Sequence, residues 1–198
     1  MPYPSQVDRT TIVAQAQQLI ESEGLAALSL AKLAEILGVK APSLYRHVDN
    51  KVDLLQAVNL LTVEQLFAAM HAERAAVNDG NAADPQARLL AIFHAFRHFA
   101  HRHPQTYTLL FSLQAAGTRP DEDYLAALAG SIQSMIAEIS GEAHALAALR
   151  GALALVHGYV MLELNRQLRR GGDLDKTFEQ VIIAYLTGWV EVRHPGTN

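Results

Sequence analysis

Apolar positions near the start of the chain recur every three or four residues, which is the period of a helix. A first set predicts a helix that Asp8 can cap and that ends at Gly24: Ile12, Val13, Ala16, Leu19 and Ile20. A second set predicts a helix that begins after Ser29: Leu30, Leu33, Ala34 and Leu37. Two short amphipathic helices are therefore expected before residue 40.

The segment from Leu37 to Lys51 predicts a helix end, a tight turn and a very short further helix. Gly38 tolerates the positive φ that follows many helices, and Pro42 suits a first helical turn. Leu44 and Val48 are four apart and can face inward, which leaves small and cationic residues outward: Lys40, Ala41, Ser43, Arg46 and His47. Such a helix fits the major groove of DNA, so this order of helices predicts a helix-turn-helix domain. A plain helical hairpin with a polar outer face would show the same periodicity.

Three motifs follow one another over about residues 8 to 55. They are Ala-x-x-Leu-Ile-x-x-x-Gly-Leu from Ala16, Ser-Leu-x-x-Leu-Ala-x-x-Leu-Gly-Val from Ser29, and Pro-Ser-Leu-Tyr-x-His-Val-x-Asn-Lys from Pro42. In this order they resemble the TetR-type transcriptional regulators. The resemblance implies that these residues face bases: Lys40, Ala41, Pro42, Ser43 and Arg46. It implies phosphate contacts for Tyr45, His47 and Lys51, with Ser29 as a further candidate.

The chain after Lys51 keeps a helical pattern that turn-forming residues divide. These breaks lie at Asn78 to Gly80, His103-Pro104, Gly117 to Pro120, Ser140-Gly141 and Gly171-Gly172. The first helix is expected to run uninterrupted to about Ala76, and no strand alternation is present. We therefore expect an all-α chain of about nine helices. A three-helix DNA-binding domain would occupy residues 1–52, and a larger helical ligand-binding and dimerisation domain residues 53–198.

Two late segments, about 146–168 and 174–192, are apolar on more than one side and need more than one packing partner. One face of each predicts a four-helix dimer interface, made of Leu149, Leu153, Val156, Val160, Phe178, Ile182, Tyr185 and Trp189. A purely intramolecular core is the alternative.

Later motifs resemble a subgroup of the same family. His103-Pro104 with Tyr107 and Phe111 matches one motif, and His157-Gly158 followed by Leu162-Glu163-Leu164 matches another, although Leu153 stands at the subgroup's Trp position. A set of residues could line a ligand cavity: Phe96, Tyr107, Phe111, Tyr159 and Glu163. Core packing explains the aromatic members equally well. Glu163 falls on an apolar face and needs a partner, which could be a group across the dimer, Arg166 or a ligand amine.

The histidines His94, His98 and His101 fall on one side of a predicted helix, at spacings that suit a metal. The apolar residues of the same segment fall on the other side, and no carboxylate lies among the histidines, so a solvated stripe is the favoured interpretation. We also find no phosphate loop, no catalytic triad and no cofactor motif. The sequence therefore predicts neither an enzyme nor a metal site.

Composition sets further limits on the protein. Hydrophobic residues make up 50% of the 198 positions and charged residues 18%, which is typical of a globular chain, and there is no cysteine for a disulfide. We expect a cytoplasmic protein without membrane contact, because Met1 to Ser5 hold no signal core and we expect no apolar run long enough to span a bilayer. The net charge of −4 does not point to DNA, yet cations cluster around the predicted turn with only Asp49 opposing them.

These features together predict a ligand-responsive transcriptional regulator. The expected form is a repressor that binds a palindromic double-stranded operator as a homodimer and is released by a small molecule, the family default; an activator stays open. One alternative is a metal-responsive regulator that uses the histidine stripe. The other is a helical interaction module without specific DNA binding.

Overall fold

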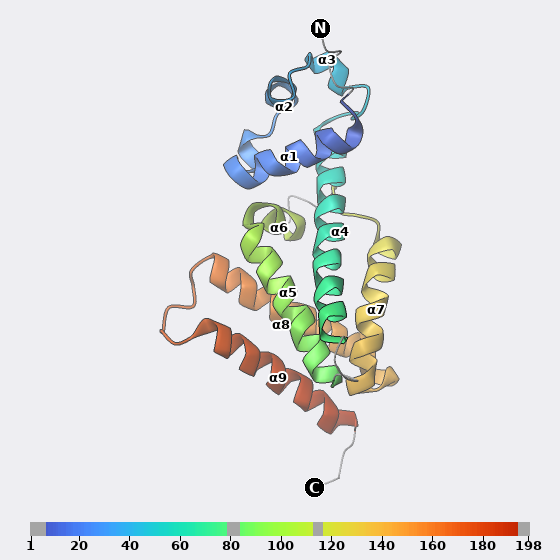
Figure 1. Cartoon of the computed structure of the whole chain (residues 1–198), viewed down its shortest axis with the longest axis vertical. Helices are drawn as coiled ribbons and strands as arrows, with labels where there is room; N and C mark the ends of the chain where they lie inside the picture. Colours follow the sequence, from blue (N-terminus) through green and yellow to red (C-terminus); the bar gives the residue numbers. More distant parts are fainter. Residues whose placement is uncertain (1–6, 79–83, 113–116, 194–198) are drawn as a thin grey trace. The chain divides into compact units, whose positions relative to one another are not determined.

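The computed structural model describes residues 7–78, 84–112 and 117–193, with side chains given outside 74–78. Within these ranges the regular elements are helices, and no strand occurs, so the all-α prediction is confirmed. Figure 1 shows them in chain order: α1 (Arg9–Glu23), α2 (Leu30–Ile36), α3 (Ala41–Leu44), α4 (Lys51–Asn78), α5 (Pro85–Arg102), α6 (Pro104–Phe111), α7 (Glu122–Ser140), α8 (Ala145–Leu164) and α9 (Leu174–Arg193). The nine α-helices of the described ranges agree with the prediction of about nine.

The helix ends follow from local sequence. Asp8 caps α1 by accepting a hydrogen bond from the Thr11 amide at 2.7 Å, and Ser29 caps α2 by accepting one from the Lys32 amide at 3.1 Å. Gly38, at φ 66°, takes the left-handed conformation after α2, as predicted. The predicted break after Asn78 coincides with the end of α4, although Asp79 and Gly80 lie outside the described residues.

The chain forms two compact units. The first comprises residues 1–65 and 103–121, and the second residues 66–102 and 122–198, so α4 contributes to both. One hydrophobic core fills the first unit and takes residues from α1, α2, α3, α4 and α6: Ile12, Val13, Ala16, Leu19, Ile20, Leu28, Leu33, Ala34, Leu44, Val48, Leu54, Val58 and Leu109. The boundary predicted between residues 52 and 53 concerns DNA binding and stays a prediction.

Helix α6 belongs to the first unit because of one carboxylate as well as Leu109. Glu21 of α1 accepts hydrogen bonds from the Gln105 amide at 3.0 Å, the Thr106 amide at 3.1 Å and the Thr106 hydroxyl at 2.8 Å. These donors lie in the first turn of α6, where amides lack partners within the helix. The carboxylate thus caps α6 from a residue 85 positions earlier in the chain.

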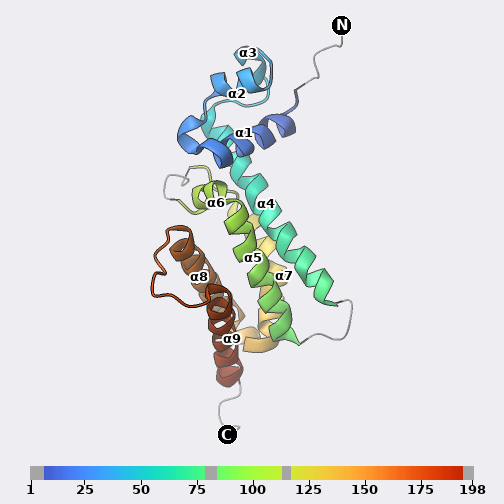
Figure 2. The ribbon, with the colours of Figure 1, turned by 60° about the vertical axis from the view of Figure 1, so that its left-hand side comes forward.

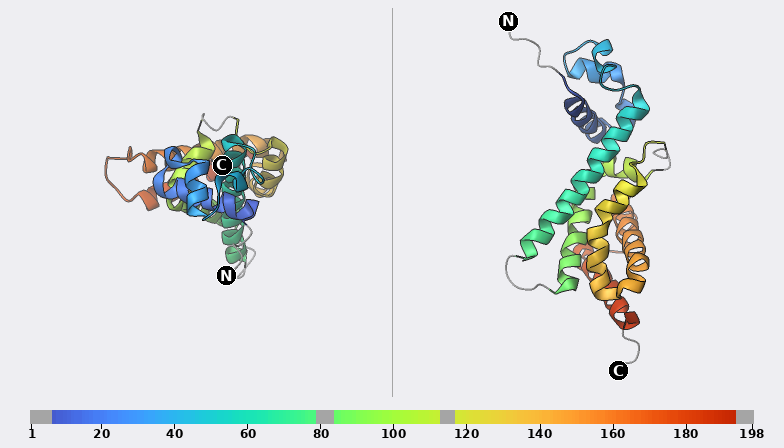
Figure 3. Two further views of the ribbon diagram at one scale, coloured as in Figure 1. Left: turned by 90° about the horizontal axis from the view of Figure 1, so that it is seen from above. Right: turned by 90° about the vertical axis from the view of Figure 1, so that its right-hand side faces the viewer.

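The second unit packs α5, α7, α8 and α9 against one another, as Figure 2 shows. Helices α7 and α8 lie side by side in Figure 3, joined through a 3₁₀ turn at Glu142–His144. The face of α5 predicted to be buried is buried, and its members are Leu89, Ile92, Phe96, Phe99 and Ala100.

Part of the predicted dimer face is buried within one chain. Four of its members are at most 1% exposed within one chain and cannot contribute area to a partner: Val156, Val160, Phe178 and Ile182. Leu149, Tyr185 and Trp189 are half-buried, and Leu153 is 47% exposed. The large apolar residues that α8 and α9 leave exposed are Leu146, Leu153, Leu162, Ile183, Val190 and Val192, and of these only Leu153 belongs to the predicted face. The apolar period marked the side of each helix that the chain itself covers.

Two helical stretches are long and apolar enough to cross a membrane by length and composition alone. They cover residues 51–73 and 142–164, with mean hydropathies of 1.2 and 1.6. The expectation that no apolar run has this length was therefore too strong. Both stretches supply buried core residues, Leu54 and Val58 in the first and Ala152 and Val156 in the second, and core helices of soluble proteins pass the same test.

Candidate nucleic-acid interface

The turn between α2 and α3 presents α3 to the outside of the first unit. The Val39 amide donates to the Ala34 carbonyl at 2.9 Å, which closes the end of α2, and Lys40 then occupies the N-cap position of α3 without a capping bond from its side chain. Leu44 and Val48 are 0% and 1% exposed and anchor this segment in the core. The inward pair predicted from sequence is therefore confirmed, and the rest of the segment is free to meet another molecule.

The residues predicted to contact DNA lie around this anchor. Six of them are exposed: Lys40, Pro42, Tyr45, Arg46, Lys51 and Ser29. The other three, Ala41, Ser43 and His47, are partly buried. Tyr45 is 57% exposed, which is unusual for a large aromatic side chain in a packed domain. Among the residues that the structure describes, Lys40 and Arg46 form no ion pair. The segment thus offers cationic and hydroxyl donors of the kind that bind phosphates and base edges.

Two of the residues predicted to contact phosphates, Lys51 and Ser29, also make hydrogen bonds that stabilise the fold. The Lys51 ammonium donates to the Leu28 carbonyl at 2.7 Å, and the Ser29 hydroxyl accepts the capping bond of α2. An ammonium has three N–H donors, so Lys51 keeps two for a phosphate. Leu28 and Ser29 directly precede α2, so Lys51 ties the start of α4 to the start of α2.

Arg9 and Asp53 were not singled out from sequence, yet they position the interface. An Arg9 guanidinium nitrogen lies 2.7 Å from an Asp53 carboxylate oxygen, and a second Arg9 nitrogen donates to the His47 carbonyl. Asp53 also accepts from the Asp49 amide at 3.0 Å, and the bond from Arg9 holds the pKa of Asp53 below its ordinary value. These contacts fix the loop between α3 and α4. No local pattern could reveal them, because Arg9 and Asp53 are 44 residues apart.

The five residues predicted to bind a ligand fall in both units. Tyr107 and Phe111 lie in the first unit with ring centroids 5.0 Å apart, and burial raises the pKa of Tyr107 well above its ordinary value. Phe96, Tyr159 and Glu163 lie in the second unit, where Phe96 is buried. The Tyr159 hydroxyl donates to the Leu174 carbonyl at 3.0 Å. Their role in ligand binding stays a prediction.

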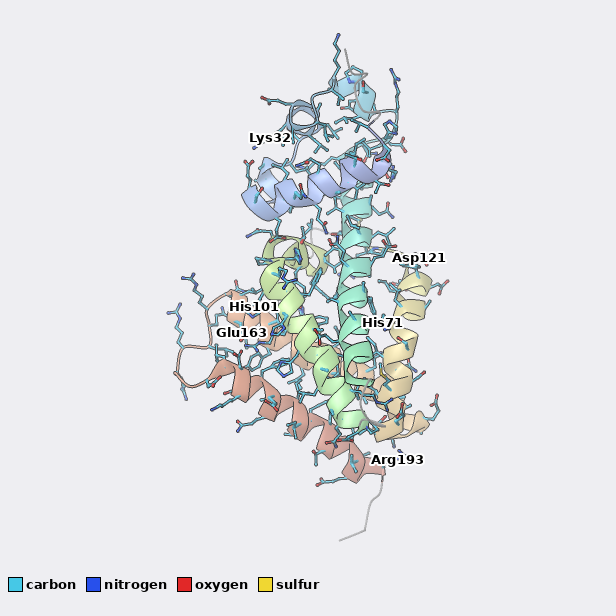
Figure 4. All side chains as sticks on the ribbon, viewed as in Figure 1. Lys32, His71, His101, Asp121, Glu163 and Arg193 are labelled. Carbon is cyan, nitrogen blue, oxygen red and sulfur yellow. The ribbon has the colours of Figure 1, made fainter. Side chains whose placement is uncertain are left out.

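Glu163 has a partner that sequence did not suggest. Arg97 of α5 donates to both of its carboxylate oxygens, at 2.8 and 2.7 Å, and also reaches Asp175 of α9 at 2.7 Å. His101 lies 3.0 Å from Glu163, and Figure 4 shows this pair. Burial opposes ionisation of Glu163, but the hydrogen bonds from Arg97 and His101 outweigh it and hold the pKa of Glu163 below its ordinary value. The proposed pairing with Arg166 is therefore wrong.

The histidine stripe is only partly solvated. His94 is half-buried with its ring edge-on to Phe178 at a centroid distance of 5.3 Å, while His98 and His101 are exposed. Burial lowers the pKa of His94, and the nearby charges of His98 and Arg97 lower it further. The Glu163 carboxylate of α8 does reach this stripe, but Arg97 already binds it. In the described part of the chain no three metal-ligating side chains of His, Cys, Asp or Glu come together.

Comparisons with known proteins agree with this geometry. The family described as "Bacterial regulatory proteins, tetR family" matches residues 12–58, and the family "Tetracyclin repressor-like, C-terminal domain" matches residues 89–185. The HTH-type transcriptional regulator Rv0681 of Mycobacterium tuberculosis, described as uncharacterized, is 32% identical over 200 residues, covering 98% of this chain and 87% of that protein. The regulator YobS of Bacillus subtilis is 26% identical over 89% of this chain and 90% of its own length.

Solved structures share the fold. A Rhodococcus protein of unknown function has a TM-score of 0.80 at 22% identity, covering 95% of this chain and 98% of its own. A TetR variant from Acinetobacter baumannii, solved in complex with minocycline, has a TM-score of 0.69 at 25% identity, covering 94% of this chain and 98% of its own. The Rhodococcus likeness shows the fold alone. The two matched families and the Mycobacterium relative show that the chain belongs to the TetR family of transcriptional regulators, which bind DNA and are not enzymes.

Proposed function

We propose that the protein is a ligand-responsive repressor that binds a palindromic operator as a homodimer. The observation that carries this proposal is the exposed, cationic side of the α3 segment over the buried pair Leu44 and Val48. A packed module without DNA binding would not need an exposed Tyr45 beside Lys40 and Arg46, two cations that form no ion pair with any described residue. Such a regulator would act in the cytoplasm, where bacterial DNA lies.

The assignment of contacts is the one that the resemblance to the TetR-type regulators implies. Lys40, Ala41, Pro42, Ser43 and Arg46 would read base edges, with Tyr45, His47, Lys51 and Ser29 on phosphates. Two α3 segments related by a two-fold axis must enter successive major grooves, about 34–36 Å apart, so the operator would be an inverted repeat. We assign the dimer contact to the exposed apolar residues of α8 and α9, among them Leu153 and Ile183.

Release by a small molecule is the second half of the proposal. The Acinetobacter TetR that this chain resembles binds minocycline, which supports a small-molecule effector here. The effector would bind within residues 53–198 and favour a conformer unsuited to the operator. It does so only through tighter affinity for that conformer, typically about 1–3 kcal/mol of coupling, and operator DNA must then weaken effector binding by the same factor. Among the residues that the structure describes, no cluster of metal-ligating side chains favours the metal-responsive alternative.

Two substitutions separate base reading from phosphate binding. Arg46→Ala should relax the preference at particular base pairs, with a loss of about 1–3 kcal/mol there if the contact is bidentate to guanine. Lys51→Ala should weaken binding to all sequences alike and lower the salt slope by about one unit. Gel-shift titrations on operator DNA selected from a random pool, at several salt concentrations, measure both effects.

Lys176→Ala is the matched control, because it removes an exposed cation of α9 and should leave DNA affinity unchanged. A thermal melt of Lys51→Ala checks that loss of the bond to Leu28 has not unfolded the domain. Uniform loss in both variants would refute base reading by Arg46. Selected DNA without an inverted repeat, or a protein that is monomeric in light scattering on DNA, would refute the dimeric operator complex.

A further inference from the structure

Two open clefts flank the segment that joins α8 to α9, residues 165–173, which projects from the helices in Figure 1. One has a volume of about 410 Å³ and the other about 360 Å³, within the range of small-molecule sites. Both are lined by Leu168, Arg169 and Leu174, so they are neighbours. Arg166 lines the first together with Glu163, whose carboxylate Arg97 holds, and Tyr159 and Arg170 line the second.

The charges around these clefts do not balance. Each nearby carboxylate has a cation beside it: Glu163 and Asp175 share Arg97, and Asp173 lies near Lys176 and accepts from the first amides of α9. Arg166, Arg169 and Arg170, by contrast, form no ion pair with any carboxylate in the ranges that the structure describes. Three guanidinium groups without a carboxylate partner within five residues stand out in a chain whose net charge is −4, and one of them, Arg169, donates a single N–H to the Arg166 carbonyl at 2.9 Å. They can bind an anion through charge-assisted hydrogen bonds.

Arg166 has a backbone conformation that usually belongs to glycine. The Arg166 amide donates to the Glu163 carbonyl and the Gln167 amide to the Leu162 carbonyl, both at 2.8 Å, which is the Schellman pattern at a helix end. Arg166 therefore takes φ 53°, and it is the only non-glycine residue with positive φ in the described chain. Glycine suits this position best, since a side chain is strained there. The arginine is explained if its guanidinium is needed beside the cleft.

We propose that these clefts bind a small amphipathic anion. Its carboxylate or phosphate head would meet Arg166, Arg169 and Arg170, and its apolar body would lie against Tyr159, Leu168 and Leu174. A purely polar anion would leave those apolar walls uncovered, and a neutral apolar molecule would leave the guanidinium groups unmatched. The site does not rest on DNA binding, so an Arg46→Ala variant should keep it.

Calorimetric titration of the full chain tests this, with decanoate as the probe, decanol as its neutral counterpart and acetate as the head alone, all below micelle-forming concentrations. Decanoate should bind saturably, and decanol about ten-fold more weakly, as expected when one charge-assisted contact is lost. Acetate should give no measurable binding. Arg166→Gly and Arg169→Ala should each weaken decanoate about ten-fold.

Arg150→Ala is the matched control, an exposed arginine of α8 that lines neither cleft, and it should bind decanoate as the wild type does. Arg166→Gly also guards against an effect of unfolding, because its melting temperature should equal or exceed that of the wild type. Unchanged decanoate affinity in both loop variants would overturn the proposal. So would decanol binding as tightly as decanoate, or a wild type that binds no decanoate.

Discussion

Burial affects the pKa of single side chains in this protein as much as nearby charge does. His94 and His157 are examples. Burial lowers the pKa of both, and for His94 the charges of His98 and Arg97 add to the effect. In the unfolded chain a histidine titrates near its ordinary pKa of about 6.5. Below that pH the unfolded chain binds protons that the folded chain resists, so protonation favours unfolding.

We therefore predict that the free energy of unfolding falls as the pH drops below about 6.5. His94→Gln and His157→Gln should each make this fall less steep, because glutamine does not titrate. Urea unfolding at pH 7.5, 6.0 and 5.0 measures the slope. Above pH 7 the wild type and the variants should show the same dependence on pH. Identical slopes below pH 6.5 would show that these histidines do not couple protonation to folding.

At the scale of elements, Arg97 joins three helices of the second unit. It binds Glu163 of α8 and Asp175 of α9 from α5, and its guanidinium carbon lies 5.0 Å from the centre of the Phe178 ring. The side chains of Arg97 and Glu163 are 7% and 3% exposed, so each depends on the other for its charge to be tolerated. Asp175 is 82% exposed and can be hydrated without a partner.

Arg97→Met should destabilise the protein by about 3–5 kcal/mol, because it leaves the Glu163 carboxylate buried with only His101 beside it. The double variant Arg97→Met with Glu163→Leu should regain most of that loss, since no buried charge remains. Urea unfolding of the wild type, the two single variants Arg97→Met and Glu163→Leu, and the double variant provides the test. Lys176→Met, which removes an exposed ion pair of 3.9 Å, should change stability by less than about 1 kcal/mol. A double variant as unstable as Arg97→Met alone would contradict the argument.

Sequence predicts those elements whose cause is local. Asp8, Ser29, Gly38 and Pro42 act within a few residues of themselves, and the structure places helix ends where they indicate. The partner of Glu163 could not be predicted in this way, because Arg97 lies 66 residues earlier and nothing in its own helix marks it as a binding group.

The interface on α8 shows a second limit of sequence. An apolar period identifies a covered side but does not say whether the cover is the same chain or another. Val156 and Val160 follow the period and are buried within the chain, whereas Leu153, placed on the same predicted face, is exposed. On a helix that is apolar all round, only the packing of the other helices separates these roles.

At the scale of the whole molecule, the proposed homodimer leads to a prediction about Leu153. Leu153→Glu should give a monomer in light scattering while the circular dichroism of the helices stays that of the wild type, because a charge is inserted where a partner would pack. Operator affinity should fall with it, since an inverted repeat needs both copies.

Ala126→Glu is the control, because it adds the same charge to an exposed position on α7 and should leave the dimer intact. Val156→Glu is a useful contrast, because a charge at this buried site should unfold the chain instead of dissociating it. A Leu153→Glu protein that remains dimeric at micromolar concentration would place the interface elsewhere.

The cap that Glu21 provides for α6 bears on how such regulators can be recombined. An engineer who exchanges DNA-binding specificity between two relatives by a single crossover near residue 52 would take Glu21 from one parent and Gln105 and Thr106 from the other. The transplanted part would also lose Leu109 from its core. A working hybrid should therefore carry residues 1–65 together with 103–121 from the same parent, which requires three junctions in the gene.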